Sequence, residues 1–228
     1  RPRSMTFDVF DKGTPAFGGK AVRKQVTIGF LKDHPDLKMD MVIYLPANAK
    51  GRVPLLLNLS FSAYNQIIDD TGLKVGEIWN REGRKIKADG APGFGGKLNV
   101  EQFIDAGLGF ATVYYGSIEP DLKEGYKHGI RGAYLKPGQA QPGDGEWGSI
   151  SAWAWGLSRA MDYFETDKTI DSKRIAIQGA SRLGKTVLWA GARDTRFAMV
   201  LASVSGEGGA AISRRNFGRD RRYPIVNR

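Results

Sequence analysis

The sequence predicts an α/β fold built around a central sheet that is largely parallel. Apolar runs of strand length recur along the chain, and they are nearly continuous, which is typical of strands covered on both faces by helices. Helical patterns separate the later runs, as in strand-helix-strand units with right-handed crossovers. The expected strands span residues 26–31, 41–45, 53–59, 110–115, 174–178 and 197–204.

The clearest helix is expected to begin near Ser149, where Ser149 or Ser151 provides a cap. Apolar residues then recur at helical spacing as far as Phe164, and we expect this stripe to pack in the core. A shorter helix is predicted over residues 99–106, and another is predicted to start after Gly184.

Two long segments, residues 67–98 and 117–148, are rich in Gly, Pro and charge and are expected to be connections. Loops this long in a compact domain usually carry function. The chain shows no internal repeat and no linker that would divide it, so residues 1–228 are predicted to form a single domain.

The composition excludes several classes of protein. Hydrophobic residues make up 41% and charged residues 25%, as in an ordinary globular domain and unlike a disordered or fibrous chain. No apolar stretch reaches the ~18 residues that a membrane span needs, and no signal peptide is recognisable at the first residue, so no membrane association is expected. With no cysteine and two histidines, the chain excludes disulfides and thiol nucleophiles, and we expect neither a metal nor a cofactor.

The net charge of +10 points toward an anionic partner, but it is unevenly placed. Residues 214–228 hold six arginines against one acidic residue, which is half of the net charge. Binding to nucleic acid would depend on this tail alone, and the sequence contains no recognisable nucleic-acid-binding module. No nucleic-acid partner is therefore expected.

Residues 174–190 predict a buried strand, a turn bounded by glycine and then a helix, and this turn has two chemical interpretations. In the first, Ser181 occupies a nucleophile elbow, a sharp strained turn that holds a serine hydroxyl above the edge of a sheet. Gly184 lies one place later than the second glycine of G-x-S-x-G, so the generic motif is matched loosely. An ordinary tight turn with a hydrogen-bonding serine is the simpler structural alternative.

In the second interpretation, residues 179–186 match G-x-x-x-x-G-K-[ST], the phosphate loop of nucleotide hydrolases. Lys185 would then bind phosphates and Thr186 a magnesium ion. Against this hypothesis, a phosphate loop normally follows the first strand of its fold, whereas most of the sheet precedes this one, and the next strand ends without a magnesium-binding Asp.

Four segments together resemble the glucuronoyl esterases, a family of carbohydrate esterases. Residues 179–185 (GASRLGK) are similar to the family's nucleophile motif, and bacterial-type members share residues 115–121 (YGSIEPD), 145–153 (GEWGSISAW) and 205–211 (SGEGGAA). The resemblance implies an α/β-hydrolase fold with three layers and a mainly parallel sheet. It covers essentially the whole chain and outweighs the match to the phosphate loop.

The resemblance implies a serine esterase that hydrolyses the ester between 4-O-methyl-D-glucuronic acid of glucuronoxylan and lignin alcohols. Ser181 would attack the uronoyl carbonyl, Arg182 would stabilise the oxyanion through its backbone N–H and guanidinium, and Lys185 would bind a sugar hydroxyl. No cofactor is implied. Because xylan bound to lignin lies outside cells, the family implies a secreted or periplasmic protein.

The chain also departs from the family. An α/β-hydrolase histidine follows the nucleophile, but His34 and His128 both precede Ser181 and are expected in surface turns. Glu207, in the loop after the next strand, is the candidate acid, and the alternative is that it holds loop amides or pairs with an arginine. Ala180 replaces the cysteine of the family motif, which favours a bacterial-type origin.

These departures lead us to expect the N-terminal portion of a longer catalytic domain that lacks its C-terminal strands and helices. A different hypothesis is a non-catalytic relative that binds acidic polysaccharide through its basic surface. The nucleotide-binding interpretation remains as a further alternative.

Overall fold

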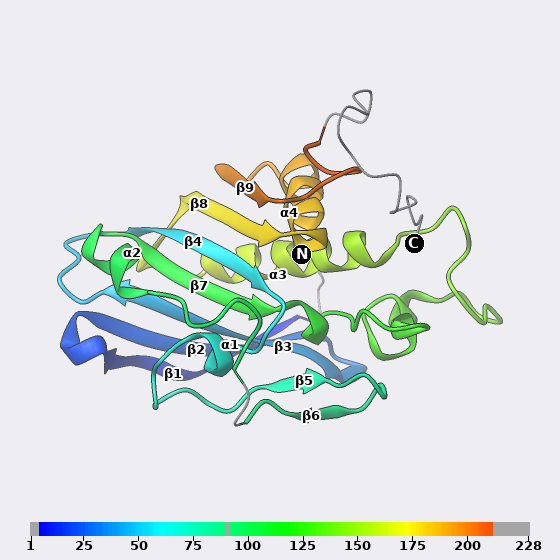
Figure 1. The fold of residues 1–228 in the computed structure, drawn as a ribbon, viewed down its shortest axis with the longest axis horizontal. Helices are drawn as coiled ribbons and strands as arrows, with labels where there is room; N and C mark the ends of the chain where they lie inside the picture. Colours follow the sequence, from blue (N-terminus) through cyan, green and yellow to red (C-terminus); the bar gives the residue numbers. More distant parts are fainter. Residues whose placement is uncertain (1–4, 90–91, 212–228) are drawn as a thin grey trace.

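The computed structural model describes residues 5–89 and 92–211, and a seven-stranded mixed sheet runs through them in the order β1-β2-β3-β7-β4-β8-β9 (Figure 1). The arginine-rich stretch at 214–228 lies outside the described residues. The strands are β1 (Thr6–Ala16), β2 (Ala21–Leu31), β3 (His34–Pro46), β4 (Val53–Ser60), β7 (Gly109–Tyr114), β8 (Ile170–Ala180) and β9 (Met199–Ser203).

The sheet is parallel in one half only. β7, β4, β8 and β9 pair in parallel, as predicted, because helices or long connections join them. β1, β2, β3 and β7 pair antiparallel, so the expectation of a mainly parallel sheet is wrong for this half. The reason is local, since only Lys32 and Asp33 separate β2 from β3, and a connection this short allows only a hairpin.

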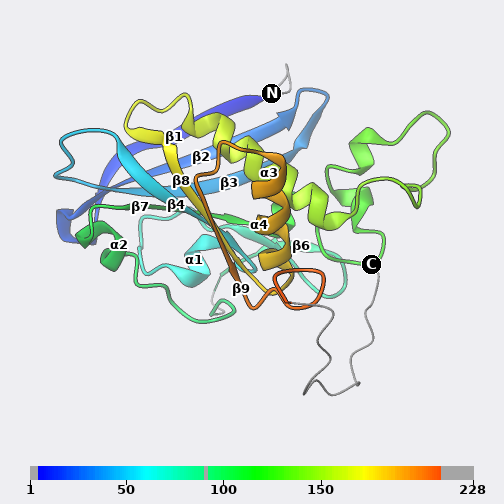
Figure 2. The ribbon, with the colours of Figure 1, turned by 90° about the horizontal axis from the view of Figure 1, so that it is seen from above.

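Helices cover both faces of the sheet and give the expected three layers (Figure 2). α3 (Ser149–Phe164) and α4 (Arg182–Arg193) pack on one face, where Trp153, Leu157 and Phe164 join the larger core cluster. α1 (Tyr64–Ile67) and α2 (Glu101–Asp105) pack on the other face in a second cluster. The apolar stripe predicted behind Ser149 is therefore a core face.

Two details of the helices differ from the prediction. α3 begins at Ser149, but its N-cap is Gly148 and no side chain caps it. The Ser149 hydroxyl instead donates to the buried Glu119 carboxylate (3.1 Å). α4 begins at Arg182 rather than after Gly184, because the chain turns into the helix directly at Ser181.

The two long connections carry structure of their own. The first contains a small hairpin of β5 (Glu77–Trp79) and β6 (Lys85–Lys87). The second contains short 3-10 turns, Gly125–His128 and Gly132–Tyr134, and is held by Glu119, which pairs with Arg131 at 2.7 Å.

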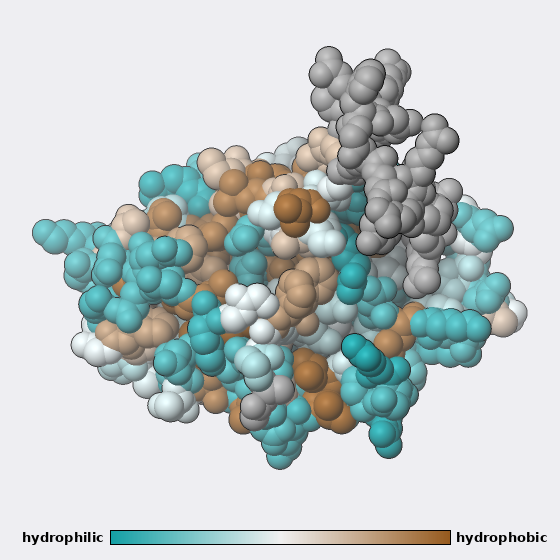
Figure 3. All heavy atoms as spheres, in the orientation of Figure 1, coloured by the Kyte–Doolittle hydropathy of each residue, from teal (hydrophilic) through white to brown (hydrophobic). Residues whose placement is uncertain are grey.

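β9 is the last strand of the sheet within the described ranges, and it exposes apolar side chains. Met199 and Leu201 on β9 are 57% and 42% exposed, and Val204, directly after the strand, is 81% exposed. Apolar surface also gathers over β8 and β9 in Figure 3. None of the helices formed by residues 5–89 and 92–211 combines the length and the apolar character needed to cross a bilayer.

Candidate active site

Ser181 is the single residue between β8 and α4, and its backbone is strained. Its φ of 55° and ψ of −124° lie in a region of backbone conformation that residues other than glycine rarely adopt. The Ser181 N–H donates to the Ser203 carbonyl at the end of β9 (2.9 Å), which fixes the turn, and the side chain is exposed. This is the sharp strand-to-helix geometry that presents a serine hydroxyl at the carboxyl edge of a sheet.

Two glycines allow this turn to form. A Cβ at Gly179 would collide with the carbonyl of Leu183, and a Cβ at Gly184 would lie 2.8 Å from the Ser203 carbonyl oxygen. The second glycine comes one place later than in G-x-S-x-G because α4 contacts the end of β9 at position 184. Position 183 does not need a glycine, since the Leu183 side chain packs fully buried in the core. The loose match to the motif therefore has a steric reason.

Thr186 and Lys185 do not have the arrangement of a phosphate loop. Thr186 is fully buried, and its hydroxyl donates to the Arg182 carbonyl (3.0 Å). The Lys185 ammonium donates to the carbonyls of Ser205 and Glu207 in the loop after β9. The Thr186 hydroxyl is therefore closed to a magnesium ion, and two of the three Lys185 donors are already used, so the nucleotide-binding alternative is not supported.

The Arg182 guanidinium is held at the edge of the sheet by three partners. Its Nε lies 2.6 Å from Oδ2 of Asp121. Its central carbon lies 4.8 Å from the ring centroid of Phe61 and 5.9 Å from that of Tyr115, within the range of cation-π attraction. Burial raises the pKa of Tyr115, although Arg182 opposes this, so the phenol stays protonated. Phe61 follows β4 and Tyr115 follows β7, so the ends of neighbouring strands orient the cation beside Ser181.

The start of α4 adds a second source of positive potential. Arg182 is the first residue of the helix, and the first N–H groups of a helix have no acceptor within it. These groups and the helix dipole favour a negative charge at this end. Ser181, the Arg182 N–H and the Arg182 guanidinium are therefore placed where a carbonyl oxygen could gain charge.

The loop after β9 brings Glu207 and Lys185 together through the backbone, because Lys185 binds the Glu207 carbonyl. The Ser205 hydroxyl accepts the Ala210 N–H (2.8 Å), which closes the loop. Val204, which lies directly before this loop, has a φ of 42° and is 81% exposed.

The two histidines lie together but not at Ser181. His34 and His128 are exposed, as expected, and line one pocket of about 610 Å³ with Trp79. The His128 ring centroid lies 5.0 Å from that of Trp79. In the part of the chain that the structure describes, neither histidine is hydrogen-bonded to Ser181, and no cluster of three or more His, Asp or Glu residues could hold a metal ion.

Sequence reasoning did not assign roles to Asp121, Phe61 and Tyr115. Asp121 and Tyr115 lie in the shared segment at 115–121, which was the available signal, but the segment alone does not show that they meet Arg182. Phe61 carried no signal beyond its place after an apolar strand.

Comparison with known proteins gives consistent matches. Residues 140–221 match a family described as glucuronyl esterase, fungi. The carbohydrate esterase MZ0003, from an unknown prokaryotic organism, is 48% identical over 214 residues, which is 91% of this chain and 49% of that protein. The chain therefore spans about half the length of this curated relative.

Solved structures agree in fold. A glucuronoyl esterase from Solibacter usitatus has a TM-score of 0.89 and 48% identity, over 96% of this chain and 56% of that one. A promiscuous CE15 esterase from a marine bacterial metagenome has a TM-score of 0.76 and 44% identity, over 92% and 54%. These likenesses confirm the expected α/β-hydrolase fold.

Proposed function

Because the chain belongs to the glucuronoyl esterase family, we propose that it forms part of a carboxylic ester hydrolase in which Ser181 attacks the carbonyl carbon of a glucuronate ester. The observation that carries this proposal is the strained backbone of Ser181 at the start of α4. A strained serine exposed at the carboxyl edge of a sheet, beside helix N–H groups, is an arrangement suited to acyl transfer.

The attack of Ser181 Oγ forms a bond to the carbonyl carbon and moves charge onto the carbonyl oxygen. The Arg182 N–H and guanidinium stabilise that charge, and Asp121 together with the rings of Phe61 and Tyr115 holds the guanidinium in place. The tetrahedral intermediate then expels the alcohol and leaves an acyl-serine, which water hydrolyses. A base must accept the serine proton, and neither His34 nor His128 is assigned this role, because both line the pocket beside Trp79.

Glu207 and Lys185 complete the proposed site. Glu207 is proposed as the acid that orients the base. Lys185 holds the loop that carries Glu207 and uses two of the three donors of its ammonium for this, so one N–H is left for a sugar hydroxyl.

The proposed substrate is the ester between 4-O-methyl-D-glucuronic acid of glucuronoxylan and a lignin alcohol. A 4-O-methyl-glucuronoyl methylesterase from Podospora anserina is 41% identical over 70 residues, 29% of this chain and 15% of that protein, which supports this class of ester. The substrate implies a secreted or periplasmic protein. We also propose that residues 1–228 contribute to a single catalytic domain.

The test is the hydrolysis of methyl and benzyl glucuronate by the protein that carries this chain. Ser181→Ala is expected to lower kcat by about 10³-fold or more, as for other activated serines. Ser172→Ala is the matched control, because Ser172 lies near the opposite end of β8. Full activity in Ser181→Ala would refute the nucleophile, and an inactive unmodified protein that binds glucuronoxylan in a salt-sensitive manner would favour the binding-only alternative.

A further inference from the structure

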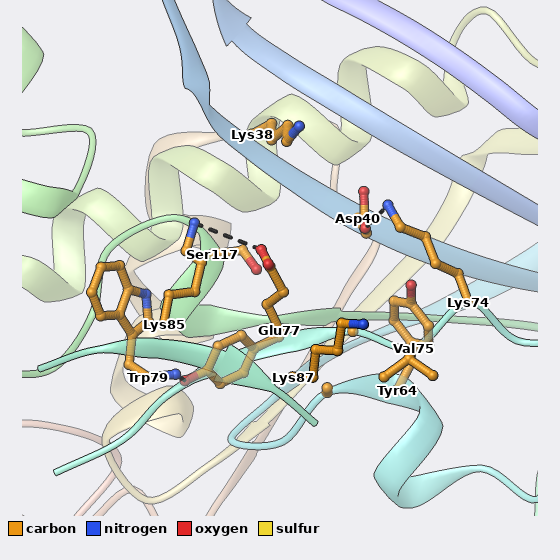
Figure 4. Close-up of a pocket in the computed structure, with 13 residues that line it drawn as sticks. Lys38, Asp40, Tyr64, Lys74, Val75, Glu77, Trp79, Lys85, Lys87 and Ser117 are labelled. Carbon is orange, nitrogen blue, oxygen red and sulfur yellow. Dashed lines mark hydrogen bonds and ion pairs between the residues drawn. The ribbon is translucent and has the colours of Figure 1, made fainter. Parts of the chain in front are cut away.

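A second pocket, of about 310 Å³, lies between β3, α1 and the β5-β6 hairpin (Figure 4). Tyr114 and Ser117 also line it, so it opens near the carboxyl end of β7, at the sheet edge where Ser181 lies. Neither Ser181 nor Arg182 is among its lining residues. The volume is at the lower end of small-molecule sites and suits one sugar ring.

The pocket is basic. Four lysines line it, against the carboxylates Asp40 and Glu77. Lys74 pairs with Asp40 (2.8 Å) and Lys85 with Glu77 (4.0 Å). The other two, Lys38 and Lys87, form no ion pair within residues 5–89 and 92–211. Both are exposed, and the pocket carries a net positive charge that favours an anionic group.

Tyr64 gives a second, independent indication of a ligand. The residue is 3% exposed, and its hydroxyl is a buried side-chain polar atom that has no hydrogen-bond partner among the described residues. In Figure 4 the hydroxyl points toward the side of the pocket where Asp40 and Lys74 lie. Burial, with a smaller contribution from the charge of Asp40, raises the pKa of Tyr64, so the group is a neutral O–H that can donate and accept. Such groups are almost always paired, because leaving them unpaired costs free energy.

Apolar side chains also line the pocket. The Trp79 ring is fixed by the bond from its Nε1 to the Gly116 carbonyl (3.0 Å), and Val75, which is 46% exposed, lies on the other side of the pocket (Figure 4). A fixed aromatic ring together with a few cations and one hydroxyl is complementary to a sugar ring that has C–H groups, hydroxyls and a carboxylate.

We propose that this pocket is a binding site for a single uronic acid residue, separate from the Ser181 turn. Lys38 and Lys87 would bind the carboxylate, and the Tyr64 hydroxyl would pair with a hydroxyl of the ring. The choice of a uronate among anionic ligands rests on the proposed function, whereas the unbalanced charge and the unpaired hydroxyl do not. A polysaccharide with several uronate branches could then be held at one branch while another branch reaches Ser181.

Isothermal titration calorimetry with D-glucuronate tests the site in the protein that carries this chain. D-glucose should bind at least about 10-fold more weakly, because it lacks the carboxylate. Lys38→Ala combined with Lys87→Ala should weaken glucuronate binding by about 10-fold or more, and Tyr64→Phe by roughly 3- to 10-fold, the range of a single neutral hydrogen bond. Lys50→Ala, in an exposed turn outside the pocket, should have no effect.

Two results would overturn the proposal directly. One is glucuronate binding that Arg182→Ala abolishes while the double lysine variant leaves it unchanged, which would place the ligand at the Ser181 turn. The other is inorganic phosphate binding as tightly as glucuronate through the same lysines, which would make the pocket a general anion site.

Thermal unfolding without ligand provides a separate test. Tyr64→Phe should keep or raise the Tm, because it removes a hydroxyl that has no partner. A clear fall in Tm would show that the hydroxyl is already satisfied in the protein, and would refute its role toward a ligand. These readouts do not depend on ester hydrolysis, so failure of the Ser181 assay and failure of this site are distinguishable.

Discussion

Ser181 holds a backbone conformation that costs the protein free energy. Its φ of 55° is unfavourable for any residue with a Cβ, and the bond from its N–H to Ser203 keeps it there. Strain of this kind persists only where the surrounding structure determines the conformation, and it concentrates at functional sites. At this position the strain places the hydroxyl on the exposed side of the turn.

The strain can be measured by comparing two substitutions at Ser181. Ser181→Gly should be more stable than Ser181→Ala by about 1 kcal/mol, because glycine adopts this conformation without a steric penalty. This difference already allows for the greater entropy that glycine gives the unfolded chain, which opposes the gain. Denaturant unfolding measures the difference. Equal stability of the two variants, or a less stable glycine variant, would show that the turn is relaxed.

Asp121 acts on the proposed reaction through Arg182. The 2.6 Å ion pair is exposed enough to contribute little to stability, so its value lies in fixing the guanidinium. Asp121→Asn should lower kcat for methyl glucuronate by about 10-fold with KM nearly unchanged, since misplacing an oxyanion donor affects the transition state more than binding.

Steady-state kinetics of Asp121→Asn and Asp121→Glu separate positioning from structure. The glutamate variant should recover part of the lost kcat, because it restores the charge. Asp171→Asn, which breaks the exposed pair with Arg174, is the control. A loss confined to KM would contradict the positioning role.

At the scale of elements, the turn depends on how closely α4 approaches β8 and β9. Gly179 and Gly184 lie where the helix and the two strands meet, and backbone atoms fill the space that a side chain would need. The close packing of α4 on β8 and β9 therefore also explains why Ser181 is exposed.

Gly184→Ala should destabilise the protein by about 2 kcal/mol, because the new methyl group would lie 2.8 Å from the Ser203 carbonyl oxygen and 3.0 Å from Ser205 Cβ. Gly51→Ala is the matched control, since a Cβ there meets nothing within 4 Å. Thermal unfolding of the two variants measures the contrast. If Gly184→Ala were as stable as Gly51→Ala, the packing of α4 on β9 would be looser than described.

A buried charge cluster joins the antiparallel half of the sheet to the segment after α1. Arg23 on β2 binds Asp11 on β1 (2.7 Å) and Asp70 (2.8 Å), and Asp70 accepts the Tyr44 hydroxyl (2.9 Å). Burial alone would raise the pKa of the Asp11 and Asp70 carboxyls. The hydrogen bonds that they accept, chiefly from Arg23, lower the pKa by more than burial raises it, so both pKa values lie below their usual range.

Each of these carboxyls has a lower pKa in the folded protein than in the unfolded chain, where it is about 4. Their ionised form therefore stabilises the fold at pH values above about 4. This stability is lost as the pH falls from there through the folded-state pKa. The Tm should therefore fall steeply below about pH 4. Arg23→Met should cost about 3–5 kcal/mol at pH 7, because it leaves two buried carboxylates without their cation, and it should flatten the acid dependence.

Circular dichroism melts between pH 7 and pH 3 measure both effects of Arg23→Met. Arg174→Met, which removes an exposed pair, should change the stability by less than about 1 kcal/mol. An unchanged acid dependence in Arg23→Met would show that the cluster does not govern acid unfolding.

Part of the fold could be predicted because its signals are local. β4 and β7 are buried on both faces, β8 has a short apolar run at residues 175–177, and the stripe behind Ser149 has helical spacing, so residue type alone marked them. β1 escaped prediction because only alternate residues are partly buried and Asp11, Gly13 and Pro15 interrupt it. Strand direction also depends on the connections, and the two-residue turn at Lys32 and Asp33 makes β2 and β3 a hairpin although both strands are strongly apolar.

The position of the elbow, at Gly179, Ser181 and Gly184, and the resemblance to the glucuronoyl esterases, through four short segments, could both be recognised from the residues alone. Three features needed the folded chain: Lys185 contacts the loop of Ser205, Asp121 meets Arg182, and the Tyr64 hydroxyl finds no partner among the described residues. The two groups of features differ in how far apart along the chain the interacting residues lie. Backbone propensity and packing periodicity act between near neighbours, whereas these contacts join residues 20 or more positions apart, which meet only when the sheet assembles.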